Sequence, residues 1–170
     1  HYLSTKRIFK LIDEMVELGA MNIDFNGGEV LMHPNCLDIL AYSMSRGFQP
    51  YISTKCPLSY ELVQGIKRIG LKKVQISLDS ADTKILVHLL KTKSNYYEIM
   101  KKTISFLEEA GIEVIIHCIL THYNSSRENV EQLVADLSLF NNINYINFDV
   151  AGYSLYKDQE SFSSLKVTEK

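Results

Sequence analysis

Residues 95–120, NYYEIMKKTISFLEEAGIEVIIHCIL, decide the fold, because a helical pattern is followed closely by a strand pattern. The two patterns predict a helix over 95–110 and a strand over 113–120. The alternation extends in both directions, with helices expected at 5–18, 36–46, 59–69 and 126–139 and strands at 21–26, 48–53, 73–79 and 143–150. The strand starts lie 27, 25, 40 and 30 residues apart, as in strand–helix units with right-handed crossovers. The sequence therefore predicts an α/β fold with a parallel five-stranded sheet flanked by helices.

The composition is that of an ordinary soluble domain with a substantial core, since 46% of the 170 residues are hydrophobic and 22% are charged. Lys and Arg number 18 against 20 Asp and Glu, and no basic run occurs. This balance argues against nucleic acid and against a charged membrane surface as partners. The sequence has no membrane-spanning stretch or signal peptide, so we expect a cytoplasmic protein. Cys36, Cys56 and Cys118 are odd in number and widely spaced, which favours reduced thiols.

The first predicted helix has a single apolar stripe, a capping serine at Ser4 and a C-terminal glycine at Gly19. The stripe consists of Ile8, Leu11, Ile12, Met15 and Leu18. A parallel unit normally begins with a strand, so we expect that a first strand is missing. Five strands cannot close an eight-stranded barrel, which leaves a partial barrel or an open doubly wound sheet. We assign residues 1–152 to this core and 153–170 to a polar C-terminal extension.

Polar residues follow the predicted strands, where both architectures bind their ligands. The candidates are Gly27, Gly28, Glu29, Ser53, Thr54, Ser77, Asp79 and Asn124. Two glycines allow the backbone to approach a ligand closely, and a carboxylate directly after them can accept hydrogen bonds from a ligand ammonium group. The simpler interpretation of Gly27, Gly28 and Glu29 is a tight turn followed by a solvated glutamate.

Four segments together resemble the core of the radical S-adenosylmethionine (radical SAM) enzymes. They are NIDFNGGEVLMHP (22–34), YISTKCPLS (51–59), VQISLDSAD (74–82) and VIIHCILTHYNSSRENVEQL (114–133). The resemblance implies the remnant of a six-stranded partial (β/α)6 barrel. It also implies that Gly27, Gly28 and Glu29 receive the methionyl amino group of the cofactor.

The resemblance further implies that Ser53, Thr54, Ser77 and Asp79 hold the cofactor's carboxylate and ribose, and Asn124 matches a frequent family asparagine. The sequence departs from the family pattern at four positions. Val30 replaces the motif's proline, Lys55 and Cys56 replace an asparagine and a glycine, and Leu90, beside Lys91, stands where an arginine is frequent.

The cofactors implied for the parent protein are S-adenosylmethionine and a 4Fe-4S cluster. In the family, three closely spaced cysteines after the first strand hold the cluster, and none of Cys36, Cys56 or Cys118 can replace them. We therefore expect the fragment itself to be inactive. The resemblance extends to peptide and protein maturases of the SPASM type, which would make a peptide or protein the substrate.

Two alternatives remain at this point. One is a degenerate, non-catalytic module that resembles a SAM-binding domain. The other is a phosphate-binding TIM-type barrel enzyme with Gly27 and Gly28 as an anion turn and Asp79 as a base, although the charge of Glu29 would repel a phosphate. A missing first strand would expose the edge of residues 21–26, and we expect either self-association there or a first helix that rearranges to cover the gap.

Overall fold

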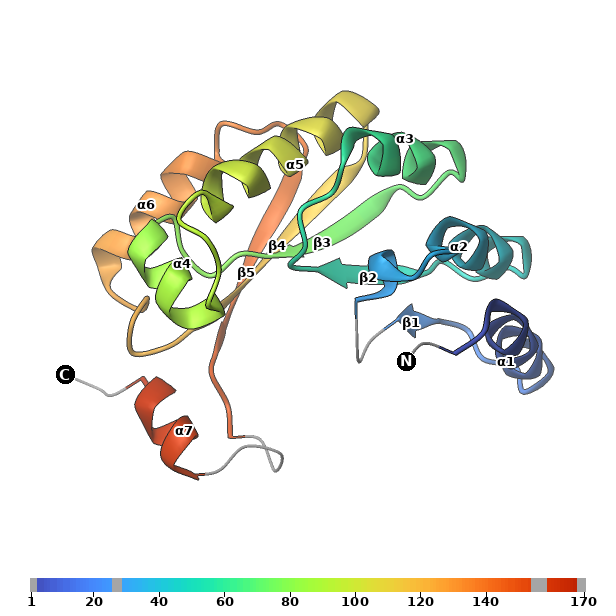
Figure 1. Ribbon diagram of the computed structural model, residues 1–170, viewed down its shortest axis with the longest axis horizontal. Coiled ribbons are helices and arrows are strands. Elements are labelled where there is room, and N and C mark those ends of the chain that lie inside the picture. Colours follow the sequence, from blue (N-terminus) through green and yellow to red (C-terminus); the bar gives the residue numbers. More distant parts are fainter. Residues whose placement is uncertain (1–2, 26–28, 154–158, 168–170) are drawn as a thin grey trace.

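The computed structural model describes residues 3–25, 29–153 and 159–167. The helices are α1 (Thr5–Glu17), α2 (Cys36–Ser45), α3 (Tyr60–Arg68), α4 (Thr83–Leu90), α5 (Tyr96–Ala110), α6 (Arg127–Leu137) and α7 (Gln159–Leu165), with a 3-10 turn η1 (Val30–Met32). The strands are β1 (Asp24–Phe25), β2 (Tyr51–Thr54), β3 (Lys73–Ser77), β4 (Glu113–Leu120) and β5 (Ile143–Val150). The expected α/β fold is thereby confirmed (Figure 1).

The order of the strands distinguishes a partial barrel from a doubly wound sheet. All neighbouring strands are parallel, and their order in the sheet is β1-β2-β3-β4-β5, the order of the chain. A doubly wound sheet reverses direction at a switch point, whereas a barrel sheet adds each strand on the same side. Helices α2 to α6 accordingly cover one face of the sheet, while α7 lies beyond the carboxyl end of β5 (Figure 1). The fold is a partial barrel.

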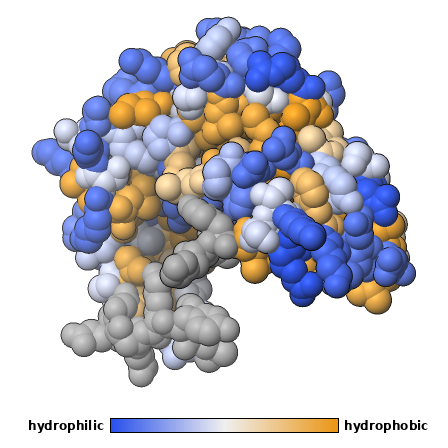
Figure 2. All heavy atoms as spheres, turned by 45° about the vertical axis from the view of Figure 1, so that its right-hand side comes forward, coloured by the Kyte–Doolittle hydropathy of each residue, from blue (hydrophilic) through white to orange (hydrophobic). Residues whose placement is uncertain are grey.

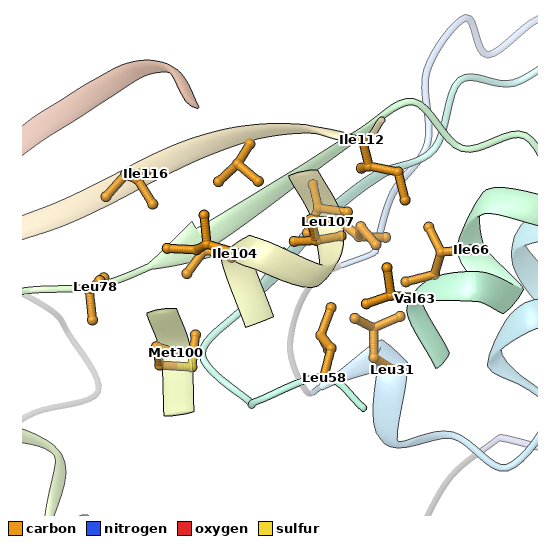
Figure 3. Packing of buried hydrophobic residues seen from close by; sticks show 14 of the residues in the cluster. Leu31, Leu58, Val63, Ile66, Leu78, Met100, Ile104, Leu107, Ile112 and Ile116 are labelled. Atoms are coloured by element: carbon orange, nitrogen blue, oxygen red, sulfur yellow. The ribbon is translucent and has the colours of Figure 1, made fainter. Parts of the chain in front are cut away.

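The main core lies between this helical layer and the sheet. Alternate strand residues point into it, among them Ile76 of β3 and Ile116 of β4, and both are fully buried. From the helical side, Met100, Ile104 and Leu107 of α5 pack against them (Figure 3). Each buried side chain of this size contributes roughly 1.5–3 kcal/mol through removal from water. The core thus holds the strand ends, and the residues that follow them, in fixed register.

Helix α1 begins where its sequence predicts and ends one residue earlier than expected, at Glu17. The Ser4 hydroxyl accepts a hydrogen bond from the Arg7 N–H at 3.3 Å, and Gly19 adopts φ +74°, the left-handed conformation that suits glycine. Ile12 is buried in a second small cluster with residues of α2. Leu18, which we expected on the apolar stripe, is 85% exposed because the helix ends at Glu17.

The predicted strand over 21–26 is much shorter in the structure, where β1 comprises only Asp24 and Phe25. Met21 is 86% exposed rather than packed, whereas Ile23 is buried. β1 stands at the edge of the sheet and pairs with β2 on one side. The self-association that we expect at this edge stays a prediction.

Helices α4 and α7 were not predicted. Asp82 caps α4, since its carboxylate accepts hydrogen bonds from the backbone N–H groups of Lys84 and Ile85 at 2.6 and 3.3 Å. α7 lies within the segment assigned to a polar extension, and the Leu165 carbonyl at its end accepts a hydrogen bond from the His122 N–H at 2.9 Å. The boundary at residue 152 stays a prediction.

The surface carries both hydrophilic and hydrophobic residues. Hydrophilic residues cover much of the outer rim of the face in Figure 2, and hydrophobic patches lie between them. Within the described part of the chain, no helix is long and apolar enough to cross a membrane.

Candidate functional site

Glu29 is the best-placed of the predicted ligand-binding residues. It lies between β1 and η1, and its Oε2 atom accepts a hydrogen bond from the Thr54 hydroxyl at 2.8 Å. Thr54 is held in turn, because its Oγ1 atom accepts the Cys56 N–H at 2.9 Å. The second carboxylate oxygen, Oε1, is buried and has no hydrogen-bond partner among the residues that the structure describes. A buried acceptor in this state is costly, so Oε1 is available to a donor from beyond the described residues.

Tyr96, at the start of α5, carries a buried phenol next to the loop after β2. Burial and then the charge of Asp79 raise the pKa of Tyr96 to about 12, and Glu29 and the thiolate that Cys56 forms at alkaline pH add to the effect. The Tyr96 hydroxyl donates a hydrogen bond to the Lys55 carbonyl at 2.7 Å, which ties α5 to the loop after β2. The sequence analysis did not single out Tyr96 as a candidate. In the sequence, Tyr96 stands out only as an aromatic residue at the start of a predicted helix.

The thiol of Cys56, a weak hydrogen-bond donor, lies beside the Glu29 carboxylate. Burial and then the charge of Glu29 raise the pKa of this thiol, and Lys55 partly opposes them. Cys56 is therefore a protonated thiol at neutral pH, and its position beside Glu29 adds no second negative charge to the site.

Asp79 and Asn124 form a joint between the loops after β3 and β4. The Asp79 carboxylate accepts the Ile119 N–H at 2.8 Å, while the Asp79 carbonyl accepts the Asn124 amide at 2.6 Å. Asn124 is completely buried, and its Oδ1 atom also accepts hydrogen bonds from the N–H and the hydroxyl of Thr121 at 2.6 and 2.8 Å. In this arrangement Asn124 braces the loops.

Ser53 and Thr54 are neighbours in the sequence but point to opposite faces of β2. Thr54 meets Glu29, whereas the Ser53 hydroxyl accepts the Gln75 amide at 2.8 Å on the face away from the helical layer. Ser77 ends β3 in register with His117 of β4. Gly27 and Gly28 lie outside the described residues.

A polar row that the sequence analysis did not assemble crosses the face of the sheet opposite the helical layer. The Tyr51 hydroxyl bonds to Gln75, whose amide also lies 3.3 Å from His117 Nδ1, and His117 Nε2 lies 2.7 Å from the Asp149 carboxylate. The row links β2 to β5. In the sequence, this row is visible only as polar residues at alternate positions of successive strands. The register of the sheet brings these residues side by side.

Comparison with known proteins identifies the family. A sequence profile of the radical SAM superfamily matches residues 1–137. The chain belongs to the radical SAM superfamily. The alternative of a phosphate-binding TIM-type enzyme finds no support in this match.

Two curated relatives share part of the sequence. The chain is 36% identical over 78 residues to the Fe-coproporphyrin III synthase of Methanosarcina barkeri, a match that covers 45% of this chain and 20% of that protein. It is 28% identical over 122 residues to the AdoMet-dependent heme synthase of Nitratidesulfovibrio vulgaris, covering 71% and 33% respectively. The matches thus span a fifth and a third of these relatives.

A solved structure with the same fold is SuiB of Streptococcus suis, with a TM-score of 0.76 at 16% identity over 100% of this chain and 37% of that one. At this identity the likeness concerns the fold alone. The named relatives by sequence are therefore enzymes of heme synthesis, whereas the maturase resemblance extends only to structural neighbours.

The radical SAM family implies S-adenosylmethionine and a 4Fe-4S cluster as cofactors. The buried, unpartnered oxygen of Glu29 fits the ammonium group of the first. For the second, the structure places Cys36 and Cys118 in buried positions and Cys56 in a half-buried one. Among the described residues no three His, Cys, Asp or Glu side chains form a metal-binding group.

Replacement of Asp79 by asparagine should make stability less dependent on pH. Burial raises the pKa of Asp79 above its usual value, against the opposing effects of the Ile119 N–H and the positive charges of Lys55 and His117. The folded state thus binds the proton more tightly than the unfolded chain does. The resulting stability is complete below about pH 3.9, the unfolded value, and is lost as pH rises through the folded pKa.

We expect Asp79→Asn, whose amide oxygen can still accept the Ile119 N–H, to gain stability relative to the wild type as pH rises from 4 to 7. Urea unfolding at intervals across this range measures the difference. Asp38→Asn, which removes an exposed carboxylate, serves as the control. A variant that loses stability relative to the wild type with rising pH would contradict the assignment.

Proposed function

We propose that this chain provides the S-adenosylmethionine-binding part of a radical SAM enzyme that acts on a tetrapyrrole. The observation that carries the proposal is the Glu29 carboxylate, with one oxygen held by Thr54 and the other buried without a partner among the described residues. Membership in the superfamily supports the cofactor, and the two heme-synthesis relatives favour the substrate class.

In this proposal each residue of the chain has a binding or positioning role. Glu29 accepts hydrogen bonds from the cofactor ammonium group, and Thr54 orients its carboxylate. Ser53, Ser77 and Asp79 contact the cofactor's carboxylate and ribose. Gly27 and Gly28 let the backbone close on the ligand, Asn124 keeps the loop after β4 in place, and residues 153–170 form an extension to the core.

When bound, S-adenosylmethionine supplies one-electron chemistry that removes a hydrogen atom from a substrate. The contribution of this chain is to fix the cofactor relative to the substrate and to exclude water, since hydrogen transfer demands close approach of the reacting atoms. We propose a cofactor-binding role for this chain, carried by the residues named above.

A peptide substrate is the second candidate. A further SuiB structure, described as bound to the precursor peptide SuiA, has a TM-score of 0.77 at 17% identity over 99% of this chain and 36% of that one. The likeness to SuiB supports a shared fold. The 36% identity to the Methanosarcina barkeri enzyme is a similarity of sequence, which supports a closer relationship. We therefore favour the tetrapyrrole.

Comparison of two ligands tests the proposed cofactor site. S-adenosylmethionine and 5′-methylthioadenosine share the adenosine and the sulfur atom, but only the former carries the amino and carboxylate groups. We expect methylthioadenosine to bind at least tenfold more weakly in equilibrium dialysis, because a hydrogen bond to a charged group is worth about 1.5–3 kcal/mol. Equal affinities, or no binding of either ligand, would favour the degenerate module.

A further inference from the structure

A pocket beside the Glu29 site is lined by three lysines. It has a volume of about 630 Å³ and lies between the loop after β2 and the loop that joins α4 to α5. Lys55 comes from the first loop and Lys91 and Lys93 from the second. The volume falls within the roughly 300–1,000 Å³ of small-molecule sites.

The charge of this pocket has one sign. No Asp or Glu is among the described residues that line it. In the same part of the chain, none of the three lysines belongs to an ion pair. Three cationic side chains at one pocket repel one another, and an anionic ligand would relieve that repulsion.

The remaining lining gives the pocket an amphipathic character. Leu90, Ile99 and the buried Tyr96 present apolar surface, next to the lysines. A free phosphate would leave this surface without a contact. An organic anion with a broad apolar body would use both parts of the pocket.

Lys91 is placed at the pocket by the end of α4. It is the C-cap residue of that helix and has φ +53°, the left-handed conformation in which many helices end. Among the described residues it is the only one other than glycine with a positive φ.

We propose that this pocket binds the carboxylates of the substrate, an organic polycarboxylate with an apolar body such as a porphyrin. The proposal rests on the proposed function and names the feature of the substrate that the chain would recognise. Hydrogen bonds place the pocket near Glu29, because Cys56 lines the pocket and its N–H donates to Thr54 Oγ1, which itself donates to Glu29. Bound carboxylates would therefore hold the substrate next to the cofactor.

Titration with coproporphyrin III, followed by its fluorescence, tests the proposal on the chain as it stands. We expect Lys55→Met combined with Lys93→Met to weaken binding severalfold, since two ammonium–carboxylate contacts of exposed side chains are removed. Lys91→Asn, which tolerates the left-handed backbone, should weaken binding severalfold. The control is Lys72→Met combined with Lys102→Met, which makes the same change in net charge at exposed positions outside the pocket.

Further measurements distinguish the sources of the carboxylate. The tetramethyl ester of coproporphyrin III should bind the wild type and the lysine variants equally, and Glu109→Gln, at an exposed position of α5, should leave coproporphyrin binding unchanged. If the lysine variants lose S-adenosylmethionine binding but keep coproporphyrin binding, the pocket serves the cofactor and the proposal is wrong. An equal loss of binding in the control variant would also overturn the proposal. So would displacement of coproporphyrin III by inorganic phosphate at an equal concentration.

Discussion

Glu29→Gln should weaken S-adenosylmethionine binding by at least tenfold while stability hardly changes. The substitution keeps the shape of the side chain and an oxygen that can accept the Thr54 hydroxyl, now at 2.8 Å from Oε2. It removes the negative charge that the proposed ammonium contact requires. Hydrogen bonds to charged groups contribute about 1.5–3 kcal/mol, and each 1.4 kcal/mol corresponds to about a factor of ten in affinity.

A cycle of two ligands and two proteins isolates this contact. If Glu29 meets the amino group, Glu29→Gln should affect binding of S-adenosylmethionine and leave that of 5′-methylthioadenosine unchanged. Glu109→Gln, at an exposed position of α5, is the matched control. Calorimetry at millimolar ligand suits the weak binding that we expect of this chain. Tight binding of S-adenosylmethionine that is indifferent to Glu29→Gln would refute the role of Glu29.

Asn124→Ala should lower the free energy of unfolding by about 3 kcal/mol or more, the largest effect on stability that we expect from a polar residue here. Asn124 accepts hydrogen bonds from the Thr121 N–H and hydroxyl and donates to the carbonyls of Asp79 and Ile119 at 2.6 and 2.9 Å. Alanine leaves these buried groups unpaired and opens a small cavity.

Thermal unfolding measures the effect, and a shift of roughly 6–12 °C is expected for a domain of this size. Asn144→Ala removes one exposed amide from β5 and should cost less than about 0.5 kcal/mol. If Asn124→Ala unfolds like the control, the joint between the two loops carries little of the stability. If it is as stable as the wild type but loses cofactor binding, Asn124 acts on the ligand directly and not as a brace.

The parallel sheet and its helical cover could be predicted because their signals are local. Helix periodicity, the cap at Ser4 and the glycine at Gly19 each act within a few residues of the chain. Helix α4 escaped prediction although Asp82 caps it, since the eight residues Thr83–Leu90 are largely apolar and can equally suit a buried strand. The short β1 shows the same limit, because pairing with β2 and not the pattern of 21–26 sets its length.

The candidate site divides in the same way. The sequence alone determined that Gly27, Gly28 and Glu29 follow a strand, that Ser53 and Thr54 end another, and that their ligand side is the carboxyl edge of a parallel sheet. Only the tertiary structure decided that Thr54 turns to Glu29 and Ser53 to Gln75, and that Tyr96 joins them. It also brought Lys55 together with Lys91 and Lys93 in one pocket. The physical reason is that these partners are separated by 22 to 41 positions in the chain, so their contacts depend on crossovers and register, which local patterns do not encode.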